Sequence, residues 1–390
     1  MDYSKPHYDI LDGLRGVAAL AVLCYHLFEA IAFAAGRPEQ DMFHGFMAVD
    51  FFFILSGFVM GYAYDDRWKT SYKSLQGRTT DGKDADTFTL DSFIRRRLIR
   101  LHPMVVMGAV LGLVAFCMQG CTRWDGSEVS VGTLLVAFLL ALFLLPVPSQ
   151  LDVRGNTELF PLNGPHWSLF FEYIGSLLYA LLLRRMPTRW LRVWVVVAGV
   201  LLLLNALWQG EGMIAYGWSS QPLNMLGGLL RLTFGYPAGL LLARLATHRP
   251  QHAGRSGWVF LACSLILVAL LAVPNLGALS LYYQVLCVTC LFPAIVWVGS
   301  RAVLAGSVQR VASFLGRLSY PLYAIHYPLI YLYIHWINTD AHPFGAGAWN
   351  TPLALSLIAI VLATLIMLCY DEPLRRKLMV QLKKTQTNHA

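Results

Sequence analysis

Charged residues are scarce in this chain of 390 residues: they make up 13% of it, whereas hydrophobic residues make up 57% and the mean hydropathy is +0.54. So little charge excludes an ordinary soluble domain and indicates a protein that crosses the lipid bilayer several times. The net charge of +8 does not indicate a nucleic-acid partner, because basic loops on one side of a membrane produce the same excess. We predict no nucleic-acid partner.

Metal-binding and redox patterns are also missing. Most of the seven cysteines lie in apolar segments, and Cys287 and Cys290, two residues apart in one of them, have no matching set of histidines. A zinc site would need a second pair of ligands. We interpret the cysteines as small residues in helix contacts and predict neither a metal nor a required disulfide.

The chain has no pattern of a cleavable signal peptide, no internal repeat and no low-complexity tract. Lys5 precedes an apolar segment that carries ionisable residues, and no small-residue cleavage site follows a short apolar core. The first helix is therefore expected to remain as a signal anchor. We expect a single transmembrane domain over 1–371, interrupted by a polar cytoplasmic loop at 65–93 that is rich in Gly, Thr and Asp, and a basic cytoplasmic tail over 372–390.

Apolar segments of membrane-spanning length recur along the whole chain. If the sixteen-residue segment 132–147 does not cross, 25 Lys and Arg lie on the inner side and 3 on the outer side; if it crosses, the split is 11 and 17. The positive-inside rule favours the first arrangement. The prediction is an all-α polytopic membrane protein with a re-entrant or interfacial segment near 132–147, both termini cytoplasmic, and ten transmembrane helices at 9–34, 45–64, 101–119, 166–183, 193–208, 225–243, 258–273, 281–299, 318–337 and 351–371.

The first helix carries Asp12, Arg15, His26 and Glu29. Arg15 and His26 are eleven residues apart, about three helical turns, so they lie on nearly the same face, and Asp12 can neutralise Arg15. Ionisable side chains inside a bilayer are costly and usually belong to a functional site. We interpret Arg15 and His26 as parts of one site. The alternative is that Arg15 reaches the membrane surface and His26 bonds a neighbouring carbonyl.

Three further ionisable residues are predicted at the depth of His26. Asp50, Glu172 and Arg231 belong to other helices and lie about 6 to 9 Å from the same outer face. Four such groups are tolerated if they face one another or a water-filled cavity, so we predict that they form one cluster. The alternative, four separate side chains that reach the interface, suits short acidic side chains poorly.

Basic residues mark the inner side. Arg97 and Arg100 are one turn apart and can share a helix face, and the tail adds Arg375 at the same level. Guanidinium groups bind phosphate oxygens in pairs, so these three are candidates for phosphate binding. Basic residues at the inner end of a helix are also ordinary topology signals, and that alternative stays open.

Six stretches resemble, in order, the acyltransferase-3 family of membrane-bound acyltransferases. They are LDGLRGVAALAVLCYH, VDFFFILSGF, RRRLIRLHP, HWSLFFEY, GRLSYPLYAIHYP and YDEPLRRKL, and the matches within them run from residue 11 to residue 376. The first contains the family's pattern of a basic residue, ten residues and a histidine, here Arg15 and His26. The third contains Arg-x-x-Arg followed by proline. The resemblance covers nearly the whole chain.

The resemblance implies transfer of an acyl group, commonly acetyl, to a hydroxyl of a carbohydrate or related acceptor, such as a glycan or lipid-linked sugar. The donor would be cytoplasmic acyl-CoA, with acetyl-CoA as a substrate rather than a permanently bound cofactor, and the enzyme would lie in the bacterial inner membrane. Some members carry a C-terminal SGNH domain. This sequence ends 19 residues after its last predicted helix, so we expect the acceptor chemistry within the membrane domain.

In the predicted mechanism, Arg97 and Arg100 hold the phosphates of CoA with help from Arg375, and the pantetheine arm runs past Arg15. Neutral His26 then removes the proton of the acceptor hydroxyl as it attacks the thioester. A covalent acyl-histidine step stays open.

Asp50 or Glu172 is expected to orient the ring of His26. His326 is expected to line the cavity rather than act as a second base. The residues predicted to contact substrate or line the cavity are Ser56, Trp167, Ser168, Arg231, Tyr323 and His326.

Buried charges in ten helices also suit a proton-coupled transporter or a lipid or glycan flippase, in which His26, Asp50 and Glu172 would relay protons. Short, broken helices at corresponding positions of two halves would favour a carrier, and the sequence shows no such symmetry. The acceptor, the acyl chain length and the oligomeric state stay open.

Overall fold

A computed structural model describes residues 7–34, 43–75, 88–210, 212–246, 256–339 and 350–388. Within these ranges all regular elements are helices, and β contacts are limited to three isolated bridges. Eight helical stretches there are long and apolar enough to cross a membrane. The prediction of an all-helical membrane protein is therefore confirmed for the described residues, whereas the count of ten transmembrane helices is not.

The eight stretches follow the predicted apolar segments. They are α1 (Asp9–Ala34), η1 with α3 (His44–Met47, Ala48–Leu75), α4 (Leu90–Met118), α6 (His166–Leu181), α7 (Thr188–Gln209), α8 (Pro222–Ala246), α10 with η5 and α11 (Ser280–Leu286, Cys287–Leu291, Phe292–Gly299), and α13 with η6 and α14 (Asn350–Ile366, Met367–Asp371, Glu372–Asn388).

The other two predicted spans are also helical. The first, α9 (Ser256–Leu271), has 16 residues, and the second, α12 (Gly306–Thr339), has 34 residues but is rich in tyrosine, histidine and proline. Helix α9 is not among the eight candidates because it is shorter than 18 residues, and α12 is not among them because no 18-residue stretch of it is apolar enough. The segment near 132–147 forms α5 (Val131–Leu142). Its 12 residues rise only about 18 Å, less than the bilayer core, in agreement with a segment that does not span.

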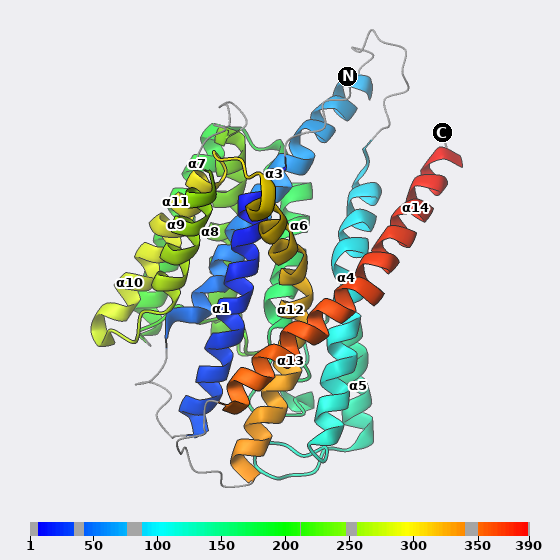
Figure 1. Ribbon diagram of the computed structural model, residues 1–390, viewed down its shortest axis with the longest axis vertical. Coiled ribbons are helices and arrows are strands. Elements are labelled where there is room, and N and C mark those ends of the chain that lie inside the picture. Colours follow the sequence, from blue (N-terminus) through cyan, green and yellow to red (C-terminus); the bar gives the residue numbers. More distant parts are fainter. Residues whose placement is uncertain are drawn as a thin grey trace.

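The polar α12 lies inside the bundle and packs along α1, and it also contacts α4 and α13. In Figure 1 both α1 and α12 run from the upper end of the bundle to the lower end, and α14 leaves at the upper right. The two backbones approach closely at Gly16, where an added Cβ atom would lie 2.5 Å from the carbonyl oxygen of Leu315. Because α12 is shielded by its neighbours, its polar residues can face a cavity instead of lipid.

A second close helix pair, α3 with α8, positions the other wall of the interior. Here a Cβ atom at Gly239 would lie 1.8 Å from the carbonyl oxygen of Ile54. The outer surfaces of α7, α9 and α13 are apolar, with exposed residues such as Val196, Leu204, Leu265, Leu353 and Leu357. Small residues at helix contacts and large apolar residues outside are the arrangement expected in lipid.

One predicted boundary is wrong, and one predicted segment has a structure that the sequence did not indicate. Helix α3 continues to Leu75 and α4 begins at Leu90, so much of the predicted loop 65–93 is helical; residues 76–87 lie outside the described residues. The predicted tail 372–390 is helical to Asn388, because α14 continues α13 through the π-helical turn η6. Hydropathy ends a segment where polar residues begin, whereas a helix continues as long as its backbone hydrogen bonds are made.

Candidate active site

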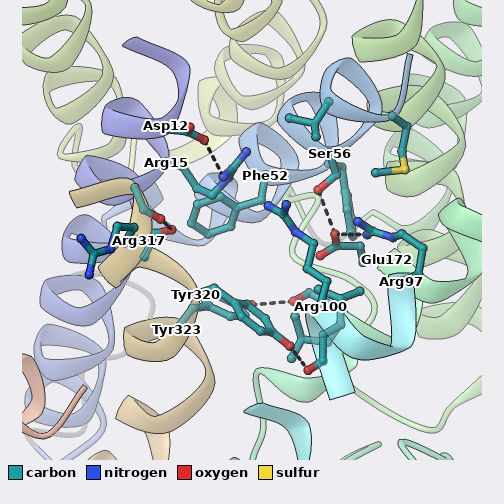
Figure 2. Close-up of a pocket in the computed structure, with 18 of the residues that line it drawn as sticks. Asp12, Arg15, Phe52, Ser56, Arg97, Arg100, Glu172, Arg317, Tyr320 and Tyr323 are labelled. Atoms are coloured by element: carbon teal, nitrogen blue, oxygen red, sulfur yellow. Dashed lines mark hydrogen bonds and ion pairs between the residues drawn. The ribbon is translucent and has the colours of Figure 1, made fainter. Parts of the chain in front are cut away.

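A cavity of about 350 Å³, the central cavity, lies between α1, α3, α4, α6, α12 and α14 (Figure 2). Most of the residues predicted for the site line it. They are Arg15, Ser56, Arg97, Arg100, Ser168, Glu172, Tyr323 and Arg375, joined by Asp12, Phe52, Arg317 and Tyr320. The cavity therefore combines several guanidinium groups with hydroxyl groups and aromatic rings.

The carboxylate of Glu172 is held by residues from two other helices. Arg97 donates from Nη2 to Oε1 of Glu172 at 2.8 Å and from Nε to Oγ of Ser176 at 3.1 Å. The hydroxyl of Ser56 donates to the same carboxylate oxygen at 3.2 Å (Figure 2). With Arg97 only 4% exposed, its charge is neutralised inside the protein. Arg97 thus forms an ion pair with the carboxylate of Glu172. The sequence, which predicts a phosphate ligand for Arg97, does not indicate this pair.

The other cavity arginines differ in their partners. Arg15 donates from Nη1 to Oδ1 of Asp12 at 2.9 Å, as the spacing in the first helix suggests. Arg375 lies 2.8 Å from Asp371. The side chain of Arg100 projects into the cavity (Figure 2), and no carboxylate of the described residues lies within ion-pair distance of it. Arg100 is therefore the cavity arginine whose charge is most available to a ligand.

Ser168, Tyr323 and Phe52 contribute hydroxyl groups and aromatic rings to the wall of the central cavity. The hydroxyl oxygens of Ser168 and Tyr323 are 2.7 Å apart, and Ser168 also donates to the carbonyl of Pro165 at 3.1 Å. The ring of Phe52 meets Tyr323 edge to face, with 5.4 Å between centroids. Two hydroxyl groups and two aromatic rings thus meet in this part of the cavity wall.

His26 does not line the central cavity, but it adjoins the wall at Tyr323 through His326, whose ring centroid lies 5.8 Å from that of Tyr323. Its Nδ1 is 2.8 Å from Oε2 of Glu29, and Tyr25 donates to the other oxygen of Glu29 at 3.3 Å. The ring of His26 stacks on that of His326 at 5.3 Å between centroids and meets Tyr327 edge to face at 4.7 Å. The carboxylate that orients His26 is therefore Glu29, and the predicted partners Asp50 and Glu172 are wrong.

His326 is 1% exposed and does not line the central cavity. Its Nδ1 lies 3.1 Å and 2.9 Å from the carbonyl oxygens of Leu322 and Tyr323. Carbonyl oxygens only accept, so Nδ1 carries a hydrogen. The ring of His326 is thus fixed in orientation between Tyr323 and His26.

Asp50 and Arg231 form a fully buried pair outside the central cavity. Arg231 donates from Nε and Nη2 to the two carboxylate oxygens of Asp50 at 2.9 Å and 2.8 Å, and from Nη1 to the carbonyl of Tyr216 at 2.7 Å. Its guanidinium also lies 5.1 Å from the ring centre of Trp167. Asp50, Trp167 and Arg231 therefore do not line the central cavity.

The predicted single cluster of four ionisable groups is consequently three separate pairs: Asp50 with Arg231, Glu172 with Arg97, and His26 with Glu29. Glu29 was recognised only as an ionisable residue of the first helix. Its spacing of three residues from His26, which places both on one helix face, is the signal that identifies it as the partner.

A further buried network at the lower end was missed from the sequence. Arg154, 2% exposed, donates to the carbonyl of Pro161 at 2.9 Å and to Gln119 at 2.7 Å, and its guanidinium lies 3.6 Å from the ring centre of Tyr331. The hydroxyl of Tyr331 donates to Glu158. Burial raises the pKa of Glu158 to about 7, although Arg154 and the bond from Tyr331 oppose that shift.

Comparison with known proteins gives one family and several relatives. A family described as "Acyltransferase domain" matches residues 8–371. The chain is 34% identical over 187 residues to "Protein 2 in picA locus" of Rhizobium radiobacter, covering 46% of this chain and 85% of that protein.

Two relatives have names that state an activity. Acyltransferase MdmB of Streptomyces mycarofaciens is 30% identical over 203 residues, which cover 49% of this chain and 43% of MdmB. Peptidoglycan O-acetyltransferase OatA of Listeria monocytogenes is 25% identical over 354 residues, which cover 85% of this chain and 50% of OatA. The chain thus spans about half the length of these two relatives or less. No solved structure matches it.

Proposed function

Because the chain belongs to the acyltransferase-3 family, we propose that it transfers an acyl group, acetyl in the simplest case, from acyl-CoA to a hydroxyl of a carbohydrate or related acceptor. The observation that supports the proposal best is the central cavity, which joins a set of arginines at one end to the Ser168–Tyr323 hydroxyl pair at the other. Family membership favours an enzyme over the transporter or flippase that the buried charges also suit.

The proposed orientation places the upper end of Figure 1 in the cytoplasm of a bacterium, with the domain in the inner membrane. Arginines concentrate at that end: Arg67, Arg96 and Arg376 lie there in addition to the arginines of the central cavity. The positive-inside rule assigns such an end to the cytoplasm. Acyl-CoA would then enter from the upper end, and a glycan or lipid-linked sugar would reach His26 from the lower end.

The donor's thioester would lie near Ser168 and Tyr323, which approach His26 through His326: the ring centroids of Tyr323 and His326 are 5.8 Å apart, and those of His326 and His26 are 5.3 Å apart. Either hydroxyl can turn its hydrogen towards a carbonyl oxygen, which stabilises the negative charge that develops when the acceptor attacks. Arg15 and Arg100 line the route of the pantetheine arm. Arg15 stays protonated and serves to bind rather than to move protons.

His26 would act as the general base. Glu29 accepts the hydrogen on Nδ1, which leaves Nε2 free to take the proton of the acceptor hydroxyl. As the acceptor oxygen bonds to the acyl carbon, the carbon–sulfur bond breaks and CoA leaves as the thiolate. The name of the Listeria relative, a peptidoglycan O-acetyltransferase, supports acetyl as the transferred group and a carbohydrate hydroxyl as the acceptor.

The test uses the purified protein in lipid nanodiscs with radiolabelled acetyl-CoA and lipid-linked glycan acceptors. His26→Gln should lower acceptor-dependent CoA release at least about 100-fold, the usual contribution of a general base. His44→Gln is the matched control, since the ring of His44 is buried and bonds a backbone carbonyl, that of Val273 at 2.8 Å, whereas the ring of His26 bonds the carboxylate of Glu29 at the same distance. Wild-type turnover in folded His26→Gln protein would reject His26 as the base.

A further inference from the structure

A second cavity of about 490 Å³, the upper cavity, adjoins the central cavity and has a strongly cationic wall. Its charged lining consists of a single carboxylate, Glu372, and five arginines: Arg67, Arg96, Arg100, Arg375 and Arg376. Glu372 is already held by Arg317 through bonds of 2.7 Å and 3.1 Å. The wall therefore carries an excess of positive charge that its own carboxylate does not balance.

Three of these arginines have no carboxylate within 4 Å among the residues that the structure describes: Arg67, Arg100 and Arg376. The guanidinium of Arg67 lies over aromatic rings, 5.6 Å from the centre of Tyr64. Arg375 has its own partner, Asp371, at 2.8 Å. Like charges around one space repel each other, and guanidinium groups bind phosphate oxygens strongly and in pairs. The upper cavity thus suits a ligand with several phosphate groups.

The two cavities share Arg100 and Arg375 in their walls. Each volume lies in the range of small-molecule sites, and only the central cavity reaches the hydroxyl groups of Ser168 and Tyr323. A ligand that fills both would have a polyanionic end in the upper cavity and a narrow, nearly uncharged arm in the central cavity. Acyl-CoA has this form, with a 3′-phosphate and a diphosphate on its nucleotide and a pantetheine arm that ends in the thioester.

We propose that the upper cavity is the binding site for the 3′-phosphoadenosine diphosphate end of acyl-CoA, with Arg67 and Arg376 as phosphate ligands. The proposal rests on the proposed function for the identity of the donor. It replaces Arg97, whose charge is used by Glu172, with two arginines from α3 and α14. A donor that lacks the nucleotide would then bind without help from either residue.

The test compares Arg67→Gln/Arg376→Gln with a control of equal charge change, Lys69→Gln/Arg301→Gln, in phosphatidylcholine nanodiscs. Lys69 and Arg301 lie outside both cavities; Lys69 is 3.7 Å from Asp66, and Arg301 lies over the ring of Trp297. The KM for acetyl-CoA should rise about 10- to 100-fold per arginine lost, with kcat retained. The KM for S-acetyl-pantetheine should not change, nor should either value in the control.

Binding of adenosine 3′,5′-bisphosphate, measured by calorimetry, requires no acyl transfer and separates this proposal from the proposed function. The wild type should bind this probe, and Arg67→Gln/Arg376→Gln should bind it at least about tenfold more weakly. Equal binding by both proteins would overturn the proposal even if acyl transfer is established. The proposal also fails if the variant changes only the response to phosphatidylglycerol, because the arginines would then bind a lipid headgroup. Bisphosphate binding that depends on both arginines, without any acyl transfer, would support this site while refuting the proposed function.

Discussion

Replacing Asp50 by Asn should lower the stability of the protein without changing the chemistry of the molecules that remain folded. Asp50 is 0% exposed and Arg231 is 1% exposed, and two hydrogen bonds join them. Removing one charge of a buried pair leaves the other uncompensated, at a cost of about 3–5 kcal/mol. We expect the lower part of that range, because Asn keeps one acceptor and the carbonyl of Tyr216 still accepts from Arg231.

The assay is thermal unfolding of the purified protein in detergent, combined with acyl transfer measured well below the melting temperature and divided by the folded fraction. The double variant Asp50→Leu/Arg231→Met removes both charges and should recover much of the lost stability. Asp91→Asn is the control, since Asp91 pairs with Arg95 at 2.8 Å on the exposed surface. Such a pair contributes less than about 1 kcal/mol.

One result would refute this reasoning. If Asp50→Asn protein unfolds at the wild-type temperature but has lost acyl transfer, Asp50 acts in the chemistry, and the structural role that we assign to its pair with Arg231 is wrong. A destabilised variant with wild-type turnover per folded molecule would instead separate Asp50 from the catalytic residues.

Three other predictions follow from single contacts. Glu29→Gln should lower turnover at least about tenfold by releasing the ring of the base, and Glu29→Asp should restore part of it; unchanged turnover with radiolabelled acetyl-CoA would contradict this. Because the pKa of Glu158 is raised to about 7, above its unfolded value, the native state should lose stability as pH rises from about 4 to 7. Melting curves of Glu158→Gln should show a weaker dependence over that range. Gly239→Ala should lower the melting temperature, since its Cβ would meet the carbonyl of Ile54 at 1.8 Å, whereas Gly257→Ala, with no contact nearer than 3.7 Å, should not.

Hydropathy located the helices because lipid and a tightly packed interior both select apolar side chains over long stretches. It was weakest where those two environments differ. Helix α12 is polar because it faces other helices rather than lipid, so its 34 residues do not satisfy a criterion based on apolarity. The ends of α3 and α14 project past the apolar windows, and a rule that reads only hydropathy ends both helices too early.

The same early ending explains why the pair of Arg97 with Glu172 was not predicted. A third helix that starts at residue 101 leaves Arg97 at the membrane surface, where a phosphate ligand is plausible. Helix α4 in fact starts at Leu90, with Thr89 as its N-cap, so Arg97 lies two turns inside and meets Glu172. The sequence correctly indicated that Asp50 and Arg231 lie at a similar depth in the membrane. Which residues then pair depends on the rotation of each helix about its axis, and only the packing of the helices determines that rotation.

Pairing, more than depth, separates structural from functional charges in this protein. Asp50 satisfies Arg231, and Asp65 accepts from both Arg244, at 2.7 Å, and Tyr179, at 2.8 Å. The charges of such groups are already neutralised by a partner within the protein, so these groups are poor candidates for binding a ligand. Arg100 lines both cavities without a carboxylate partner among the described residues. A buried or crowded charge without a partner raises the energy of the empty protein, and a ligand that supplies the missing charge lowers it. At the arginines of the upper cavity that have no carboxylate partner among the described residues, binding of the proposed donor should therefore raise the stability of the protein.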